Sequence, residues 1–247
     1  MLSVRQLLPA PLDEADPYDV YRPDDPSRPL LRLNMVVTVD GAVRDEHGRS
    51  GGLGSEGDRE VFRTLRALAD GILVGAGTVR VEGYGPHRLT QRLAQRRAGD
   101  GRVEPAPIVV VSRSLALNLN TPLFTEARTP TVVVTCASAP AQQRRAIEQV
   151  GRVLVAGDQD VDLSWAVAAL RDELGLAHLL CEGGPTLNAG LFAKGLVDEL
   201  CITRAPILAG PGQLGIAAGP VTARRLELVS LCAQRAELYA RYRLSPE

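Results

Sequence analysis

Two glycine-containing segments of the chain each follow a short apolar run and could bind phosphate. The first is Gly75-Ala76-Gly77-Thr78, and the second is Gly183-Gly184-Pro185-Thr186. Glycine has no Cβ, so its backbone N–H can come close to an anionic oxygen. Thr78 and Thr186 add hydroxyl donors, and Pro185 suits the first turn of a helix, where its missing N–H is not needed. The two segments predict strand-to-helix turns that can hold an anion.

Neither segment is a complete nucleotide-binding fingerprint. The sequence "GAGTVR" (75–80) lacks the third glycine of G-x-G-x-x-G, and neither segment has the G-K-[ST] of a P-loop. Each alone is also compatible with an ordinary turn. A third segment, Ser112-Arg113-Ser114, follows another apolar run and suits either a ribose 2′-phosphate or an exposed polar turn. Taken together, the three favour an extended anionic ligand such as a dinucleotide.

Composition and charge argue against nucleic acid or membrane as partners. The 247 residues are 45% hydrophobic and 23% charged, and the net charge is −1. Such a chain has no global field that attracts nucleic acid or an anionic membrane. It begins without a signal pattern and has no apolar stretch long enough for a bilayer, so we expect a cytoplasmic protein.

The cysteines and histidines do not follow metal-site spacing. No C-x-x-C pair occurs, and no histidine lies near a cysteine or carboxylate at ligand spacing. The sequence therefore predicts buried, reduced thiols and no metal site. The residues concerned are Cys136, Cys181, Cys201, Cys232, His47, His87 and His178.

Short apolar runs that alternate with amphipathic segments predict an α/β domain with a largely parallel sheet. Helical patterns cover 55–70, 139–150 and 163–174. After about residue 208 no helical pattern intervenes, so we expect the sheet to end in antiparallel strands. The expected strands are 31–39, 72–75, 107–112, 131–135, 152–156, 178–184, 197–208 and 236–244.

Several local features refine this picture. Residues 1–28, rich in proline and aspartate, predict an extension without its own core, followed by a single domain at 29–247. Ser55, three residues before Asp58, predicts a helix start close to a capping box. Trp165 is expected in the core, on the apolar side of its helix. The arginine-rich stretch 88–107 is expected to be a surface loop or an irregular helix.

The order of these motifs resembles a known enzyme family. The blocks that carry the resemblance are "NMVVTVDGAV" (34–43), "GAGTVR" (75–80), "IVVVSRS" (108–114) and "LLCEGGPTLNAGLF" (179–192). From about residue 31 onward the chain resembles the reductase domain of the bacterial riboflavin-biosynthesis deaminase–reductases, and within that family the free-standing pyrimidine reductases. This implies a dihydrofolate-reductase-like fold: a mixed, mostly parallel sheet with flanking helices and antiparallel C-terminal strands.

The resemblance also implies the reaction and the cofactor. A hydride from NADPH would reduce the ring-opened ribosyl chain of a phosphorylated aminopyrimidinedione to a ribityl chain. A homodimer is expected from the family and from the apolar alternation at 236–244. The implied cofactor-binding residues are Thr38, Gly75, Gly77, Thr78, Ser112, Arg113, Gly183, Gly184, Pro185 and Thr186.

Asp40 and Glu182 occupy the family's acidic positions and are the implied catalytic residues. Asp40 also suits a plain Asp-Gly turn, and the dipole of a following helix would by itself favour Glu182. The substrate-binding candidates are Asn34, Tyr84 and Arg88.

The substrate segments depart from the family pattern. Asn34 stands where many bifunctional members have lysine, and "EGYGPHRL" (82–89) replaces their DDP-x-L-T-x-R. These departures keep a dihydrofolate or pterin reductase open as an alternative. A non-catalytic NADPH-binding protein is a third.

Overall fold

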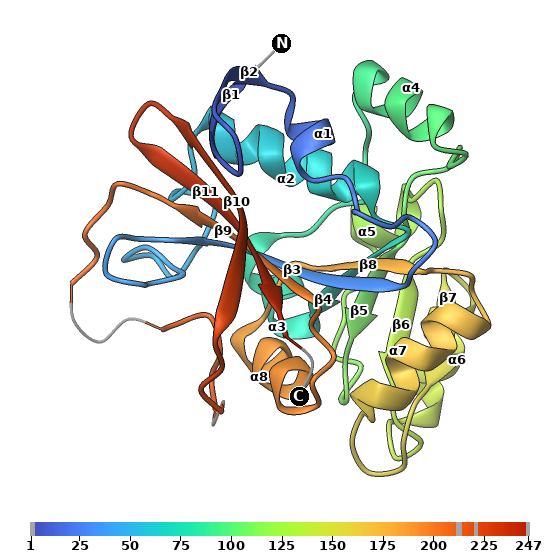
Figure 1. The fold of residues 1–247 in the computed structure, drawn as a ribbon. Coiled ribbons are helices and arrows are strands. Elements are labelled where there is room, and N and C mark those ends of the chain that lie inside the picture. The colour runs from blue at the N-terminus through green and yellow to red at the C-terminus, as the bar shows by residue number, and fades with distance from the viewer. Residues whose placement is uncertain (1–2, 211–213, 220–221, 246–247) are drawn as a thin grey trace.

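The computed structural model describes residues 3–210, 214–219 and 222–245. Over these ranges eleven strands form one mixed sheet in the order β2-β1-β10-β11-β9-β3-β8-β4-β5-β6-β7 (Figure 1). The strands are β1 (Val4–Leu8), β2 (Leu12–Ala15), β3 (Leu30–Val37), β4 (Gly71–Gly75), β5 (Ile108–Val111), β6 (Val132–Thr135), β7 (Arg152–Val155), β8 (His178–Cys181), β9 (Glu199–Arg204), β10 (Leu226–Gln234) and β11 (Glu237–Leu244).

The strands from β9 to β7 in this order run parallel to one another. Their side chains are apolar on both faces because helices cover both, and for this reason the sequence shows continuous apolar runs rather than alternation. Since the strands are parallel, all their carboxyl ends lie at one edge of the sheet. The predicted mixed, mostly parallel sheet and its antiparallel C-terminal strands are confirmed.

The antiparallel part contains strands that the sequence did not predict. β10 pairs with β11, β11 with β9, and the N-terminal extension adds β1 and β2 beyond β10. The extension has no core of its own, but Tyr18 and Tyr21 are buried in the main core. Glu199 ties this part together, since it pairs with Arg32 at 2.6 Å and with Arg241 at 2.5 Å.

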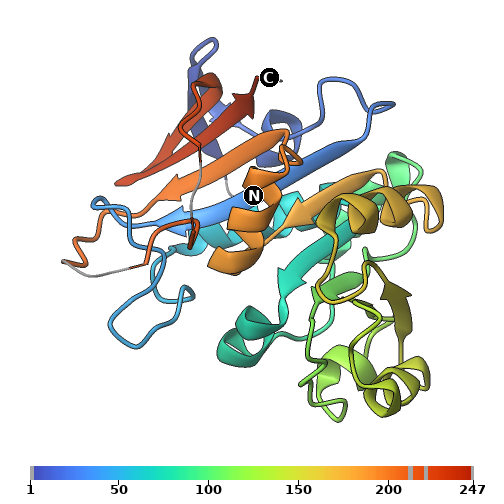
Figure 2. The same cartoon turned by 90° about the horizontal axis from the view of Figure 1, so that it is seen from below.

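Helices lie on both faces of the sheet (Figures 1 and 2). One hydrophobic core lies between the sheet and the helices α2 and α4. The other lies between the opposite face of the sheet and the helices α7 and α8. The helices are α1 (Pro17–Val20), α2 (Glu56–Leu68), α3 (Ala76–Glu82), α4 (Gln91–Gly99), α5 (Pro122–Thr125), α6 (Ala141–Glu148), α7 (Leu163–Asp172) and α8 (Pro185–Ala193).

Three local expectations need correction. Ser55 is the N-cap of α2 and accepts from the Gly57 N–H, but its own N–H donates to Glu237 and not to Asp58, so no capping box forms. Trp165 is not in the core: it is 45% exposed, because the buried side of α7 lies at the residues that follow it. The arginine-rich stretch contains a regular helix, α4, rather than an irregular one.

The expectation for the cysteines holds. All four are buried and unpaired. Within the described ranges, no group of three or more histidine, cysteine or acidic side chains gathers where it could hold a metal ion. Each helix in those ranges is too short or too polar to span a bilayer.

Candidate active site

The two glycine segments meet at the carboxyl edge of the sheet. β4 and β8 are neighbours, and the Gly75 N–H donates to the Gly183 carbonyl at 2.9 Å, just past the end of β8. Gly183 and Gly184 have φ values of +95° and +89°, which favour glycine. A Cβ on Gly184 would lie 3.2 Å from Thr78 Oγ1. The predicted convergence of these two turns is therefore present.

The surroundings of these turns fit an anionic group. α8 has Gly184 as its N-cap and Pro185 in its first turn, and no side chain caps it, so its first N–H groups remain available for a ligand. A Cβ built on Gly77 meets nothing within 4 Å, which leaves open space at the start of α3. Thr186 is exposed beside this opening. The backbone donors and the open space suit the phosphates of a dinucleotide.

Glu182, directly before the glycine pair, is bound from two sides. It is 8% exposed. The Arg66 guanidinium donates to both carboxylate oxygens at 2.6 Å, and the Tyr84 hydroxyl donates to Oε2 at 2.7 Å. The Arg66 guanidinium also lies 4.2 Å from the centre of the Phe62 ring. α2, the end of β8 and the loop after α3 thus join at one carboxylate.

This cluster changes the acidity of its members. Burial alone would lower the pKa of Arg66, but the facing Glu182 carboxylate outweighs it and raises the pKa. Burial, and then the same carboxylate, raise the pKa of Tyr84 well above its ordinary value. Arg66 therefore stays charged and Tyr84 stays protonated at neutral pH. Both are fixed hydrogen-bond donors to Glu182.

Two of the buried polar atoms without a hydrogen-bond partner within the described residues belong to β3 and to the loop that carries Tyr84. They are Asn34 Oδ1 and His87 Nδ1, in side chains that are 7% and 6% exposed. Leu33 pairs with Cys181, so Asn34 and Glu182, the next residues on these parallel strands, lie on the same face. An unpaired buried acceptor at that position is suited to a ligand donor.

Thr38 and Asp40 form a separate unit at the end of β3. The Thr38 hydroxyl donates to Asp40 Oδ1 at 2.6 Å and accepts from the Ala42 N–H. The Asp40 carboxylate also accepts from the N–H groups of Ala209 and Gly210. These hydrogen bonds, the Thr38 hydroxyl first, lower the pKa of Asp40 to about 2. Asp40 is ionised and holds two loops together.

The remaining predicted residues are not drawn into either glycine turn or the Glu182 cluster. Ser112 is buried, and its hydroxyl accepts from the Leu115 N–H. Arg113 is exposed and lies 3.5 Å from Asp160. Arg88 is on the surface, where its 71% exposed side chain pairs with Glu126, so it does not face Glu182.

Sequence reasoning missed Arg66 and His87 as members of the site. Arg66 lies in the last turn of α2, where basic residues are common because of the helix dipole, so its type and position carry no special signal. His87 has no partner at metal-ligand spacing, so the sequence gives it no role. The one available signal was Glu182 itself, because a buried carboxylate needs a cation beside it.

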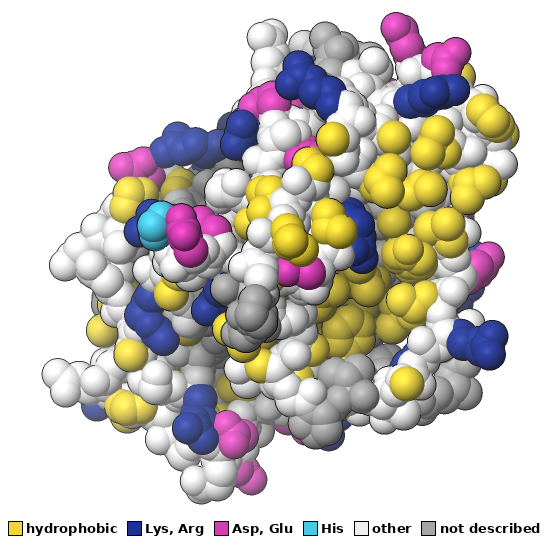
Figure 3. Space-filling model, turned by 90° about the vertical axis from the view of Figure 1, so that its left-hand side faces the viewer, with side chains coloured by type: hydrophobic (Ala, Val, Ile, Leu, Met, Phe, Trp, Pro, Cys, Tyr) yellow, Lys and Arg dark blue, Asp and Glu magenta, His cyan; other side chains and the backbone are white. Residues whose placement is uncertain are grey.

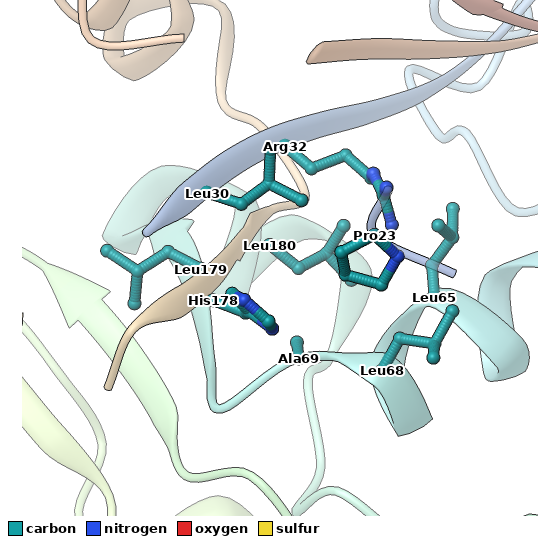
Figure 4. A pocket seen from close by; sticks show the side chains of 9 residues that line it. All are labelled: Pro23, Leu30, Arg32, Leu65, Leu68, Ala69, His178, Leu179 and Leu180. Atoms are coloured by element: carbon teal, nitrogen blue, oxygen red, sulfur yellow. The ribbon is translucent and has the colours of Figure 1, made fainter. Parts of the chain in front are cut away.

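Two cavities formed by the described residues lie away from these turns. A small cavity at the amino ends of β3 and β8 is lined by Arg32, His178 and leucines (Figure 4). A broader depression of about 800 Å³ also borders the start of β3. Both lie at the opposite edge of the sheet from Gly75 and Gly183. The candidate site is defined here by its polar groups.

The fold and this carboxyl-edge site define an α/β domain of the dihydrofolate-reductase-like class. Residues 29–239 match the RibD C-terminal domain, and the chain belongs to that family. A protein of Archaeoglobus fulgidus named 2,5-diamino-6-ribosylamino-4(3H)-pyrimidinone 5′-phosphate reductase is 35% identical over 74% of this chain and 83% of its own. A protein of the same name from Methanothermobacter thermautotrophicus is 33% identical over 74% and 80%.

Solved structures agree with the fold. A pyrimidine reductase-like protein of Corynebacterium diphtheriae has a TM-score of 0.82 at 26% identity and covers 94% of this chain and 99% of its own. A riboflavin biosynthesis reductase of Saccharomyces cerevisiae has a TM-score of 0.67 at 18% identity, over 93% of this chain and 95% of its own. At that identity the second likeness concerns the fold alone.

Proposed function

We propose that this protein is an NADPH-dependent reductase of a ribosylaminopyrimidinone 5′-phosphate. The ribose ring of the substrate opens, and hydride addition at its former anomeric carbon gives a ribityl chain. One observation carries the proposal: the start of α8, which no side chain caps and which follows the Gly75–Gly183 contact, lies next to a buried polar cluster at Glu182. The names and family of the relatives support reduction of a pyrimidinone phosphate.

The glycine turns are the proposed cofactor site. Gly75, Gly77 and Thr78 would line it on one side, and Gly183 to Thr186 would hold the pyrophosphate at the start of α8. When bound, a reduced nicotinamide supplies the hydride. The protein aligns donor and acceptor carbons and excludes water. Ser112 and Arg113 would lie toward the adenosine end, where the exposed Arg113 guanidinium suits a 2′-phosphate.

Asn34 and the Glu182 cluster are the proposed substrate side. Asn34 Oδ1 is an unpaired acceptor for a substrate N–H or hydroxyl. Glu182 is already hydrogen-bonded three times, so its proposed role is to hold Arg66 and Tyr84 in place and to offer its negative charge to a hydroxyl of the open chain. Asp40 is proposed to fix the loop beside the reacting carbon. The proton that completes the reduction would come from solvent.

The test is turnover with defined acceptors. Purified protein is incubated with NADPH and the ribosylaminopyrimidinone 5′-phosphate, or with dihydrofolate, and the loss of reduced-nicotinamide absorbance is followed. We expect turnover of the pyrimidinone only. Turnover of dihydrofolate alone would overturn the substrate assignment. Saturable NADPH binding without transfer to either acceptor would overturn the enzyme assignment.

Two variants test the cofactor site. Gly77→Ala fills open space without a clash, so we expect unchanged stability but weaker NADPH binding. Arg113→Ala should raise the KM for NADPH about tenfold and leave that for NADH unchanged, since it removes a charge-assisted hydrogen bond. An equal effect on both cofactors would contradict the placement of the 2′-phosphate.

We further propose that two copies of the chain associate through the sheet face formed by β10 and β11. Leu226, Leu228 and Leu238 lie on one face of this hairpin and are each 38–39% exposed. Figure 3 shows hydrophobic side chains gathered on this side of the molecule. Light scattering at micromolar concentration should give a dimer. Leu238→Lys should give a monomer, and Val103→Lys, elsewhere on the surface, should not.

A further inference from the structure

The N-terminal extension is fastened to α4 by its residues 16–22. These residues precede the part of the chain that matches the family, which begins at residue 29. α1 starts at the N-cap Asp16, and Tyr18 is fully buried in the core to which α2 and α4 also contribute. The extension therefore packs against the domain through residues that lie outside the range matched by the family.

Hydrogen bonds, ion pairs and a cation–π contact make this attachment. The Tyr18 hydroxyl donates to Asp100, the C-cap of α4, at 2.7 Å, and Arg22 pairs with the same carboxylate. Arg96 of α4 donates to Asp16 at 3.1 Å, and its guanidinium lies 4.5 Å from the centre of the Tyr18 ring. Because Tyr18 makes both the hydroxyl contact and the ring contact, it is the central residue of the attachment.

Arg97 then joins α4 to the end of α2. Arg97 as a whole residue is 4% exposed. Nη1 donates to the carbonyl oxygens of Ala67 at 2.8 Å and Ala69 at 2.5 Å, and Nε donates to a carbonyl of the segment after α4. The last carbonyls of a helix lack partners within it, so this guanidinium fixes the end of α2. Arg66, which binds Glu182, lies in that same last turn.

The second donor to Glu182 also depends on α4. Tyr84 lies in the loop that leads directly into this helix, whose N-cap is Thr90. In that loop His87 is buried. Both donors of the Glu182 cluster are thus attached to α4, one through hydrogen bonds to α2 and the other through the chain.

We propose that the N-terminal extension positions the substrate side of the site, and that Tyr18 is a positioning residue that acts through α4 on Arg66 and Tyr84. Without the Tyr18 hydroxyl, α4 loses one of the contacts that fix its C-terminal end, and the two donors are held less firmly on Glu182. The catalytic part of this inference rests on the proposed reductase function. The effect of Tyr18 on the positions of Arg66 and Tyr84 does not rest on that function.

The test uses the full-length chain with Tyr18→Phe, which removes the hydroxyl and keeps the ring. Asp100→Asn is the second variant, because it keeps the shape of the acceptor. The matched control is Asp13→Asn, which breaks the exposed pair with Arg5 in the same extension. Backbone deuterium exchange of residues 62–68 and 83–90 is measured in all three variants and in the parent protein.

We expect Tyr18→Phe and Asp100→Asn to raise exchange in both segments about tenfold, the effect of losing a hydrogen bond to a charged group. The control should leave both segments unchanged. In turnover, the two variants should raise the KM for the pyrimidinone and lower kcat, while the Kd for NADPH stays the same. A purely structural role would lower only the melting temperature.

Two results would overturn the inference. One is exchange in these segments that equals that of the parent protein. The other is a rise spread evenly over the whole chain, which would indicate general destabilisation. If the parent protein itself fails to reduce the pyrimidinone, the proposed function is wrong, and the exchange data still decide the positioning role.

Discussion

Replacing Glu182 by glutamine tests whether the buried cluster is held by charge. The change keeps the size of the side chain and one acceptor oxygen, but it places an amide NH₂ against the donors of Arg66. In the native fold Arg66 and Glu182 side chains are 15% and 2% exposed, and both guanidinium contacts are 2.6 Å long. The guanidinium would be left in this site without its counter-charge.

The expected loss follows from that burial. Removing one partner of a buried ion pair costs about 3–5 kcal/mol, and the retained acceptor places Glu182→Gln near the lower end, about 3 kcal/mol. The control is Glu104→Gln at the exposed pair with Arg128, whose side chains are 54% and 70% exposed. An exposed pair contributes at most about 1 kcal/mol. The contrast between the two variants isolates burial, because both pairs are arginine–glutamate contacts.

Urea unfolding measures both free energies of unfolding. A double variant, Arg66→Met with Glu182→Leu, removes both charges and should be more stable than Glu182→Gln alone, since it leaves no unpaired charge. The reasoning is refuted if Glu182→Gln loses no more stability than Glu104→Gln. It is also refuted if the double variant is the least stable of the three.

Three further perturbations test other parts of the site. Gly184→Ala should destabilise the fold by about 1–2 kcal/mol in urea, because of its φ of +89° and the approach to Thr78, whereas Gly85→Ala, in open space, should change little. Burial, and then nearby arginines, lower the pKa of His87 to about 3 in the fold. As the pH falls, His87 is therefore protonated in the unfolded chain before it is protonated in the folded protein. Stability should fall as pH drops from about 6.5 toward 3, by up to about 1.4 kcal/mol per pH unit, and His87→Gln should remove that share of the slope in urea midpoints. Asp40, whose pKa is about 2, should hold its two loops above pH 4 and release them as pH falls toward 2; Asp40→Asn should speed deuterium exchange of the two amides that it holds even at pH 7, and unchanged exchange would contradict this.

The sequence predicted the parallel strands and the turns that follow them well, for a local reason. Continuous apolar runs such as 72–75 and 131–135 bury both faces, and glycine at strand ends reports a backbone requirement that belongs to the residue itself. The same holds for Pro185, which stands in the first turn of α8 as predicted. These signals need no knowledge of distant contacts.

What the sequence did not predict depends on contacts between distant segments. β1 and β2 contain charged residues and have little alternation, and they are strands because β10 offers an edge to β1 and β1 offers one to β2. Arg66 is indistinguishable in sequence from the other arginines of α2 until Glu182 is placed beside it. Trp165 was predicted in the core from its apolar side chain, but it is exposed, because α7 turns a different side toward the sheet.

The position of β11 in the sheet has a consequence for the order of folding. β11 follows β9 and β10 in the chain, yet it lies between them and hydrogen-bonds to both. On the ribosome, β4 to β7 can assemble from sequence neighbours, whereas β9 and β10 remain unjoined until residues 237–244 have emerged. Premature termination before that point would leave two unsatisfied edges in a nascent protein whose other half is already complete, a state prone to aggregation.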